Sequence, residues 1–321
     1  MNILFVGADY NNSRDGVIVK GIYNLINFFN IKIEKNYHVL EDDKIDNHSN
    51  ITENIYDGIV ICGTPWLWDQ FQKSIKYKNL LDIISKQKKA KIMFLGVGAC
   101  IGLQHIKGNL CEDAEHQQGI RELFGKGTVV SRDSLFDKKL KKSKVESHLL
   151  PCPSFFCYLD DNNCIHSTTN VLIWCDPSKS ISKCDWQIKD EINEYNSIFK
   201  KYYELYNPKV YCAEEYDILK AKEAGLPEPI VLKNWSETLD VMKKANFVLS
   251  GRIHCAVPAF VLKKHVSIVP IDSRHLVLSD YGCPLSINNN LRFGQISLDI
   301  NKVLDDYGKI LIDFFSDCSQ P

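Results

Sequence analysis

An arginine and a histidine stand two residues apart in the segment 249–259. Here an apolar run typical of a strand gives way to small residues typical of a helix. A helix N-terminus presents unpaired backbone N–H groups and the positive end of the helix dipole, so it readily holds an anion. Arg252 and His254 would add a guanidinium and a group that exchanges protons near neutral pH. The segment predicts a site for phosphate or carboxylate, although a solvated arginine and a core histidine would give the same pattern.

A second charged cluster follows the next apolar run, at 270–275, and contains Asp272 and Arg274. Because two polar clusters at strand ends lie close together in the sequence, we expect them to border one crevice. Asp272 would orient His254 or Arg274, or accept a proton from a substrate hydroxyl. Alternatively, it caps the helical segment that starts near Arg274, since aspartate is a preferred N-cap residue.

The composition indicates real hydrophobic cores and nearly balanced charge. The chain has 321 residues, of which 45% are hydrophobic, with 39 basic against 40 acidic side chains. This length is typical of two domains of about 150 residues each. The balanced charge argues against a dedicated nucleic-acid-binding protein.

The expected location is cytoplasmic, without a membrane span. No apolar run approaches the about 20 residues that a span needs, and residues 1–7 lack the basic region of a signal peptide. The twelve cysteines form no Cys-x-x-Cys pair, so we expect reduced thiols and no metal site. The acidic residues Glu112, Asp113 and Glu115, with His116, are interpreted as a solvated helix start.

Short apolar runs alternate with longer amphipathic stretches, which is the pattern of a mostly parallel α/β sheet. Prolines within 151–156 predict a domain crossing, because proline interrupts both helix and sheet. We therefore predict an α/β fold with two facing doubly wound Rossmann-like domains, residues 1–150 and 151–321, a cleft between them, and a terminal helix that packs back on the first. The predicted strands are 3–6, 31–39, 58–62, 91–98, 127–130, 171–175, 210–212, 229–232, 247–249 and 266–269, and the main predicted helices are 17–29, 79–88, 187–206 and 298–315.

Several blocks, taken together, resemble the polysaccharide pyruvyl transferase family. The most specific block is Ser250-Gly251-Arg252-Ile253-His254, which is similar to the arginine–x–histidine signature of that family. Further similar blocks are Ile271-Asp272-Ser273-Arg274, Tyr281-Gly282-Cys283-Pro284, Val130-Ser131-Arg132-Asp133-Ser134 and Pro151-Cys152-Pro153-Ser154. The chain departs from the family at Cys255, where glycine is common, and at Gly63-Thr64-Pro65-Trp66, where the family has a run of glycines.

The resemblance implies a fold like that of glycosyltransferases of the B type and transfer of the enolpyruvyl group of phosphoenolpyruvate to a sugar as a ketal. It implies that Arg252 and His254 contact the donor, and that Arg132 reaches it from the opposite domain. His254 would be the acid/base, with Arg252 and Asp272 completing the catalytic group. Ser250, Gly251, Ile253 and Arg274 are the further expected donor-binding residues. No cofactor or metal is implied, and the partners would be the donor and a sugar or glycan acceptor.

The acceptor is expected on the first domain, near Asp9, Thr64, Trp66 and Trp68. Indole rings pack well on the C–H faces of sugars, but Trp66 and Trp68 would equally serve as core or cleft-lining aromatics. Asp9 would contact the acceptor or cap the first helix.

Two alternatives to pyruvyl transfer stay open. A nucleotide-sugar glycosyltransferase of the same architecture would use Arg252 and the helix N-terminus on a diphosphate. A non-catalytic carbohydrate- or phosphate-binding relative would retain the fold alone. A dinucleotide-dependent oxidoreductase is disfavoured, because no Gly-x-Gly-x-x-Gly follows the first strand.

Overall fold

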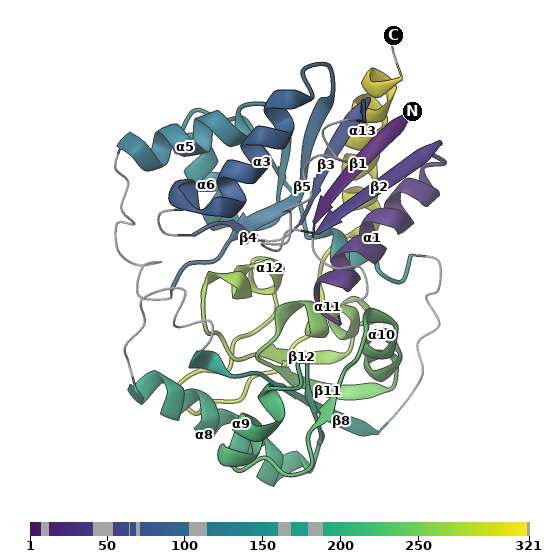
Figure 1. Ribbon diagram of the computed structural model, residues 1–321. Coiled ribbons are helices and arrows are strands. Elements are labelled where there is room, and N and C mark those ends of the chain that lie inside the picture. The colour runs from purple at the N-terminus through teal and green to yellow at the C-terminus, as the bar shows by residue number, and fades with distance from the viewer. Residues whose placement is uncertain are drawn as a thin grey trace.

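The computed structural model of the chain describes residues 1–7, 13–40, 54–63, 65–68, 71–102, 114–159, 168–178 and 189–319. It contains two parallel β-sheets, one above the other in Figure 1, each covered by helices. The predicted α/β fold with two doubly wound Rossmann-like sheets is confirmed.

The first sheet has the strand order β2-β1-β3-β5-β6-β7, and β4 pairs with β5 beside this path. All of its pairings are parallel. Its strands are β1 (Asn2–Gly7), β2 (Lys35–Leu40), β3 (Gly58–Cys62), β4 (Pro65–Leu67), β5 (Lys91–Ala99), β6 (Thr128–Ser131) and β7 (His148–Leu149).

Helices cover both faces of the first sheet because successive strand residues point to opposite sides. Ile3 and Phe5 of β1 belong to the core shared with α1 (Asp15–Phe28) and α13 (Ile300–Cys318). Leu4 and Val6 belong to the core shared with α3 (Ile75–Lys86), α5 (Ala114–Phe124) and α6 (Ser134–Lys142). A strand that is buried on both faces reads as the continuous apolar run seen in the sequence.

The second sheet has the strand order β10-β9-β8-β11-β12, again all parallel. Its strands are β8 (Thr169–Trp174), β9 (Lys209–Cys212), β10 (Ile230–Val231), β11 (Ala245–Ser250) and β12 (His265–Ile268). Its helices are α8 (Lys189–Tyr206), α9 (Asp217–Glu223), α10 (Trp235–Lys243), α11 (Ile253–Val261) and α12 (Leu276–Ser279).

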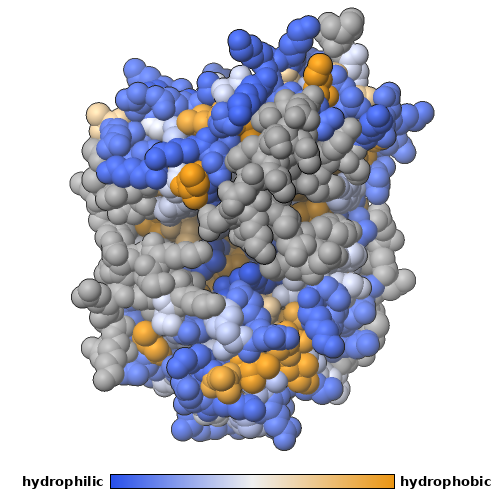
Figure 2. Space-filling view, in the orientation of Figure 1, coloured by the Kyte–Doolittle hydropathy of each residue, from blue (hydrophilic) through white to orange (hydrophobic). Residues whose placement is uncertain are grey.

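Each sheet has a point where the strand order reverses, and ligands of such sheets bind outside the strand ends at that point. In the first sheet it lies between β1 and β3, and in the second between β8 and β11. The end of β11 leads directly into Arg252, so the topology places this arginine at the reversal point of the second sheet. Figure 2 shows a hollow at the boundary between the two halves of the molecule.

The chain crosses between the halves twice. The first crossing contains the 3₁₀ helix η3 (Pro153–Phe156), which follows β7. There α1 approaches so closely that a Cβ at Gly21 would lie 1.9 Å from the carbonyl oxygen of Pro153, so only glycine fits. The second crossing leads to α13, which returns to the first sheet, where Phe314 and Cys318 lie against Gly58. The hydroxyl of Tyr307 in α13 donates to the carbonyl of Pro151 (2.6 Å).

Hydrogen bonds also join the halves near the site. The backbone N–H of Ser273 donates to the carbonyl of Ile101 (2.7 Å), and the N–H of Ile101 donates to Oγ of Ser273 (2.9 Å). The N–H of Ser134 donates to Oδ2 of Asp280 (2.8 Å). One hydrophobic core contains residues from both sheets, among them Phe5 and Val248. The two sheets are therefore held by a shared interior as well as by polar contacts.

Most predicted elements lie within a few residues of the observed ones. Helix α3 begins at Ile75, earlier than the predicted 79, because Ser74 caps it by accepting from the N–H of Tyr77 (3.1 Å). Strand β2 begins at Lys35 where 31 was predicted. Helices α9 and α10 were not predicted, since each is short.

No helix in the described part of the chain is long and apolar enough to cross a membrane. The nine described cysteines are free thiols, and all but Cys100 are buried.

Candidate active site between the two sheets

The turn after β11 fixes the position of Arg252. The hydroxyl of Ser250 accepts from the backbone N–H of Arg252 (3.0 Å) and donates to its carbonyl (2.8 Å). The N–H of Gly251 donates to the carbonyl of Ile173 on β8 (2.9 Å), and a Cβ at this position would lie 1.9 Å from the hydroxyl of Tyr195. Ser250 and Gly251 therefore shape the turn from which α11 begins, with Ile253 as its first residue.

His254 lies in the first turn of α11 and is only 8% exposed. Its Nε2 lies 3.3 Å from Nη1 of Arg132 and 3.9 Å from Sγ of Cys152. Its Nδ1 lies 3.6 Å from Oδ1 of Asp15. A guanidinium can only donate and a carboxylate can only accept. In the neutral imidazole this arrangement favours the tautomer with the proton on Nδ1, which leaves a lone pair on Nε2, whereas in the imidazolium both nitrogens carry a proton.

Asp15 is the first residue of α1 and contributes the carboxylate at His254. Burial acts to raise the pKa of Asp15, but the hydrogen bond to His254 and the charges of Arg14, His254 and Arg132 outweigh it and hold the pKa well below its ordinary value. The group is therefore a carboxylate at neutral pH. Sequence reasoning missed it, because an acidic residue in the first turn of a helix is common and carried no further signal.

Arg132 is completely buried at the end of β6, and it brings a positive charge from the first sheet to His254. Its Nε and Nη2 atoms have no hydrogen-bond partner among the described residues. The adjacent Asp133 caps α6 and accepts from the N–H groups of Phe136 (2.8 Å) and Ala99 (3.0 Å). Burial raises the pKa of Asp133 to about 6, against these hydrogen bonds and the charge of Arg132. Arg132, the arginine expected to reach the donor from the opposite domain, thus lies at His254 in the structure.

Cys152 is a buried thiol at the first crossing between the halves. Burial acts to raise its pKa, but the hydrogen bond and charge of His254, together with the charge of Arg132, lower it to about 7. The sequence indicated Cys152 only as part of a domain crossing. Its place beside His254 follows from the tertiary structure.

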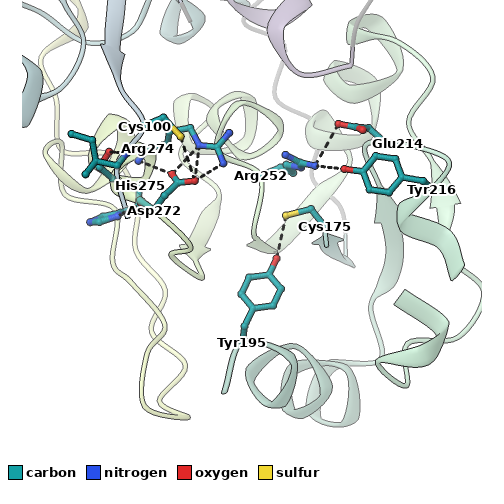
Figure 3. A network of polar contacts seen from close by, with 11 residues as sticks. Cys100, Cys175, Tyr195, Glu214, Tyr216, Arg252, Asp272, Arg274 and His275 are labelled. Atoms are coloured by element: carbon teal, nitrogen blue, oxygen red, sulfur yellow. Dashed lines mark hydrogen bonds and ion pairs between the residues drawn. The ribbon is translucent and has the colours of Figure 1, made fainter. Parts of the chain in front are cut away.

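Arg252 turns to a second group of residues, beyond the end of β9. Its Nη2 donates to Oε1 of Glu214 (3.4 Å) and to the hydroxyl of Tyr216 (3.2 Å), as Figure 3 shows, and lies 3.7 Å from Oδ2 of Asp217. Glu214 also forms an ion pair with Arg14. The two residues of the predicted motif therefore have different partners. His254 contacts Asp15 and Arg132, whereas Arg252 contacts the acidic residues beyond the end of β9.

The two groups are neighbours in the fold because α1 and α11 are in contact at the boundary. Arg14 and Asp15 are consecutive residues at the start of α1. Arg14 pairs with the glutamate that Arg252 contacts, and Asp15 faces His254. The starts of two helices from opposite halves therefore bring two arginines, a histidine and one carboxylate together, and Glu214 after β9 adds a second carboxylate.

Asp272 is bound to Arg274. The Nε of Arg274 donates to both carboxylate oxygens (2.8 and 2.9 Å), and its Nη2 donates to Oδ2 (2.5 Å). Asp272 also caps the 3₁₀ helix η4 (Ser273–His275) by accepting from the N–H of Arg274 (2.9 Å). Of the alternatives for Asp272, the structure shows the partnership with Arg274 and the cap, while the carboxylate at His254 is Asp15. Figure 3 shows this pair on the side of Arg252 opposite Glu214.

The residues expected near an acceptor are only partly described. Asp9 and Thr64 lie outside the described residues. Trp66 is 1% exposed and belongs to the core of the first half, with Nζ of Lys76 above its ring at 4.2 Å from the centroid. Its ring faces are covered by protein, which corresponds to the core alternative. Trp68 keeps part of its surface exposed.

The acidic patch expected at 112–116 is only partly described. His116 lies inside α5 and packs edge-on against Phe71, with ring centroids 5.2 Å apart. Glu115 is exposed in the first turn, whereas Glu112 and Asp113 lie outside the described residues. Within the part of the chain that the structure describes, no three His, Cys, Asp or Glu side chains form a group able to hold a metal ion.

A family model described as polysaccharide pyruvyl transferase matches residues 2–273. The chain belongs to the polysaccharide pyruvyl transferase family. The matched segment includes both sheets and the residues around His254 and Arg252. The members of this family are transferases that act in polysaccharide modification. No curated protein sequence matches it.

Solved structures that resemble this chain include UDP-GlcNAc 2-epimerases. UDP-GlcNAc 2-epimerase of Methanocaldococcus jannaschii, in complex with UDP-GlcNAc and UDP, has 9% sequence identity and a TM-score of 0.59, covering 98% of this chain and 100% of that one. A putative UDP-N-acetylglucosamine 2-epimerase of Listeria monocytogenes has 9% identity and a TM-score of 0.53, covering 100% of this chain and 90% of that one. The MnaA–UDP complex of S. aureus has 10% identity and a TM-score of 0.51, covering 99% and 90%. At these identities the likeness shows the fold alone.

Proposed function

We propose that this protein transfers the pyruvyl group of phosphoenolpyruvate to a sugar of a polysaccharide or glycan precursor, forms a ketal and releases phosphate. The observation that carries the proposal is the environment of His254, with Arg132 at Nε2 and Asp15 at Nδ1. A histidine held in one tautomer between a cation and a carboxylate is suited to taking and returning a proton.

The proposed reaction moves one proton through His254. In its imidazolium form, which Asp15 stabilises, His254 gives the proton on Nε2 to the terminal methylene carbon of the donor, which becomes a methyl group and leaves a positive charge on the central carbon. The oxygen of an acceptor hydroxyl then bonds to the central carbon, and its proton returns to Nε2. A second hydroxyl closes the ketal as the carbon–oxygen bond to phosphate breaks, and its proton leaves with the phosphate. Proton transfer of this kind contributes roughly 10²–10⁴-fold to a rate.

The donor carries a carboxylate and a phosphate, so its binding needs several positive groups. Arg132 and Arg252 supply guanidinium groups from the two halves, and the start of α11 supplies backbone N–H groups. Preorganised positive charge of this kind also stabilises the leaving phosphate. The donor itself carries the leaving group, so no cofactor enters the proposed reaction.

The test combines binding and turnover. Calorimetry should show phosphoenolpyruvate binding to the wild-type protein, with much weaker binding after Arg252→Ala. Phosphate release in the presence of sugar acceptors should fall at least about 100-fold after His254→Ala. His148→Ala is the matched control, because His148 is exposed on β7. Full activity in His254→Ala would overturn the assignment of His254.

A nucleotide-sugar reaction is the second candidate, because the structures that resemble this chain hold UDP or UDP-GlcNAc. Uridine diphosphate is therefore titrated in parallel. Binding of uridine diphosphate without binding of phosphoenolpyruvate would favour this candidate. Binding of phosphoenolpyruvate without turnover on any acceptor would favour a non-catalytic relative.

A further inference from the structure

Two arginines from opposite halves of the chain meet at one carboxylate oxygen. Arg14, which immediately precedes α1, forms an ion pair with Oε1 of Glu214. Nη2 of Arg252, the residue immediately before α11, lies 3.4 Å from the same oxygen. Glu214 follows β9 and belongs to the second half, so its carboxylate bridges the boundary.

Such a pair of guanidinium groups is a common arrangement for holding an oxyanion. The Nε of Arg252 has no hydrogen-bond partner among the described residues, although this side chain is only 9% exposed. A single carboxylate oxygen therefore leaves part of the hydrogen-bonding capacity of Arg252 unused. A tetrahedral phosphate or a second carboxylate oxygen would use more of it.

We propose that Arg14 and Arg252 form a phosphate- or carboxylate-binding site across the two halves, and that Glu214 is an internal carboxylate that occupies this site until an anionic ligand displaces it. The inference rests on the proposed function only for the identity of the natural ligand. The site itself is defined by the two arginines and is open to any oxyanion of suitable size.

The exposure of the acidic residues decides which of them is displaced. The side chain of Glu214 is 26% exposed and that of Arg14 is 24% exposed, so Glu214 can turn into water. Asp217, which also faces Arg252, is completely buried, and its Oδ1 accepts from the N–H of Asp176 (2.9 Å). Asp217 therefore stays in place and keeps part of the charge of Arg252 balanced when Glu214 leaves.

The place of the site fits a substrate that reacts at His254. Asp15 follows Arg14 in the chain and faces His254, and Arg252 lies in the same turn as His254. An anion between Arg14 and Arg252 would thus lie beside the histidine. Displacing Glu214 would also couple donor binding to the contact between the halves, because the ion pair of Glu214 with Arg14 crosses the boundary.

The test compares Glu214→Gln with Glu215→Gln, which removes the same charge from the neighbouring exposed side chain. Binding of inorganic phosphate and of phosphoenolpyruvate is measured separately by calorimetry. Loss of the internal carboxylate leaves the two arginines with excess positive charge, so Glu214→Gln should bind phosphate about five- to tenfold more tightly than wild type. Glu215→Gln should bind like wild type, and Arg14→Gln should bind at least about tenfold more weakly.

A second variant, Glu214→Ala, removes the side chain that glutamine would keep in the site, and should also bind more tightly. Wild-type or weaker phosphate binding in both Glu214 variants, with unchanged melting temperatures, would overturn the inference. Tighter phosphate binding without pyruvyl transfer would support the site and reject the proposed function. Pyruvyl transfer with unaltered phosphate affinity in the Glu214 variants would support the proposed function and reject the site.

Discussion

Nδ1 of His254 and Oδ1 of Asp15 lie 3.6 Å apart, one in the first turn of α11 and the other at the start of α1. The contact joins helices that follow the reversal points of two different sheets. A carboxylate on Nδ1 fixes the tautomer of an imidazole and stabilises its protonated form. The proposed acid/base unit is thus complete only when both halves of the chain are in contact.

Asp15→Asn should lower kcat by about 10²–10⁴-fold with little change in donor affinity, because the amide no longer stabilises the imidazolium. Phosphate release under saturating substrates measures kcat, and calorimetry measures donor binding. Asp313→Asn, at an exposed position of α13, serves as the control. An equal loss of affinity and kcat would show that Asp15 acts on donor binding.

Cys152 should make stability depend on pH. Its folded-state pKa of about 7 is lower than its ordinary value of 9.0. Between these pH values the unfolded chain binds a proton that the folded protein has released, so this contribution to the unfolding free energy rises with pH. It is fully present above the unfolded-state pKa and is lost as the pH falls through about 7. Serine does not titrate in this range.

The unfolding free energy of the wild type relative to Cys152→Ser should therefore rise by about 2 kcal/mol from pH 6 to pH 9. Urea unfolding of both proteins in reducing buffer at the two pH values measures this. The other buried thiols, such as Cys255 with a pKa raised to about 12, are present in both proteins and cancel. A difference that shrinks with pH would contradict the thiolate at Cys152.

Arg132→Met should strongly lower activity without destabilising the protein. The guanidinium is fully buried with two nitrogens unpartnered among the described residues, so the wild type bears a desolvation cost that an apolar methionine removes. We expect an equal or greater unfolding free energy in urea and a rate at least about 100-fold lower. Arg121→Met, at an exposed position of α5, should change neither. A destabilisation of several kcal/mol would mean that Arg132 is mainly structural.

Gly251→Ala should destabilise the protein by about 1–3 kcal/mol, because the added Cβ would lie 1.9 Å from the hydroxyl of Tyr195. The double variant Gly251→Ala, Tyr195→Phe removes that oxygen, leaving the ring carbon at 3.0 Å, and should recover part of the loss. Thermal unfolding measures both effects. No recovery in the double variant would locate the cost in the backbone of the turn.

The sequence predicted the strands and the turn at Arg252 because both depend on local patterns. A buried strand needs a continuous apolar run, and a strand that ends in small and charged residues predicts a ligand-binding turn. The same pattern, an apolar run followed by charged residues, also predicted a strand end just before Arg132, and in the structure β6 ends there.

The partners of these residues could not be predicted, since they depend on how two sheets meet. Asp15, Cys152 and Glu214 carry no special local pattern, yet they surround His254 and Arg252. Trp66 shows the converse, because an indole in the sequence fits a core and a sugar site equally well. Only packing distinguishes the two, and here the ring is buried.

The path of α13 determines which part of the chain can be isolated as a separate domain. The second sheet stands as an insertion between β7 and the helix that completes the first unit. A fragment that stops near residue 150 would leave Ile3 and Gly58 without Phe314 and Cys318, and the bared apolar face should drive aggregation. The hydroxyl of Tyr307 lies 2.6 Å from the carbonyl of Pro151, so α13 also contacts the first crossing. The unit that can be isolated intact is therefore discontinuous: the first sheet and α13, joined by a short linker in place of the inserted domain.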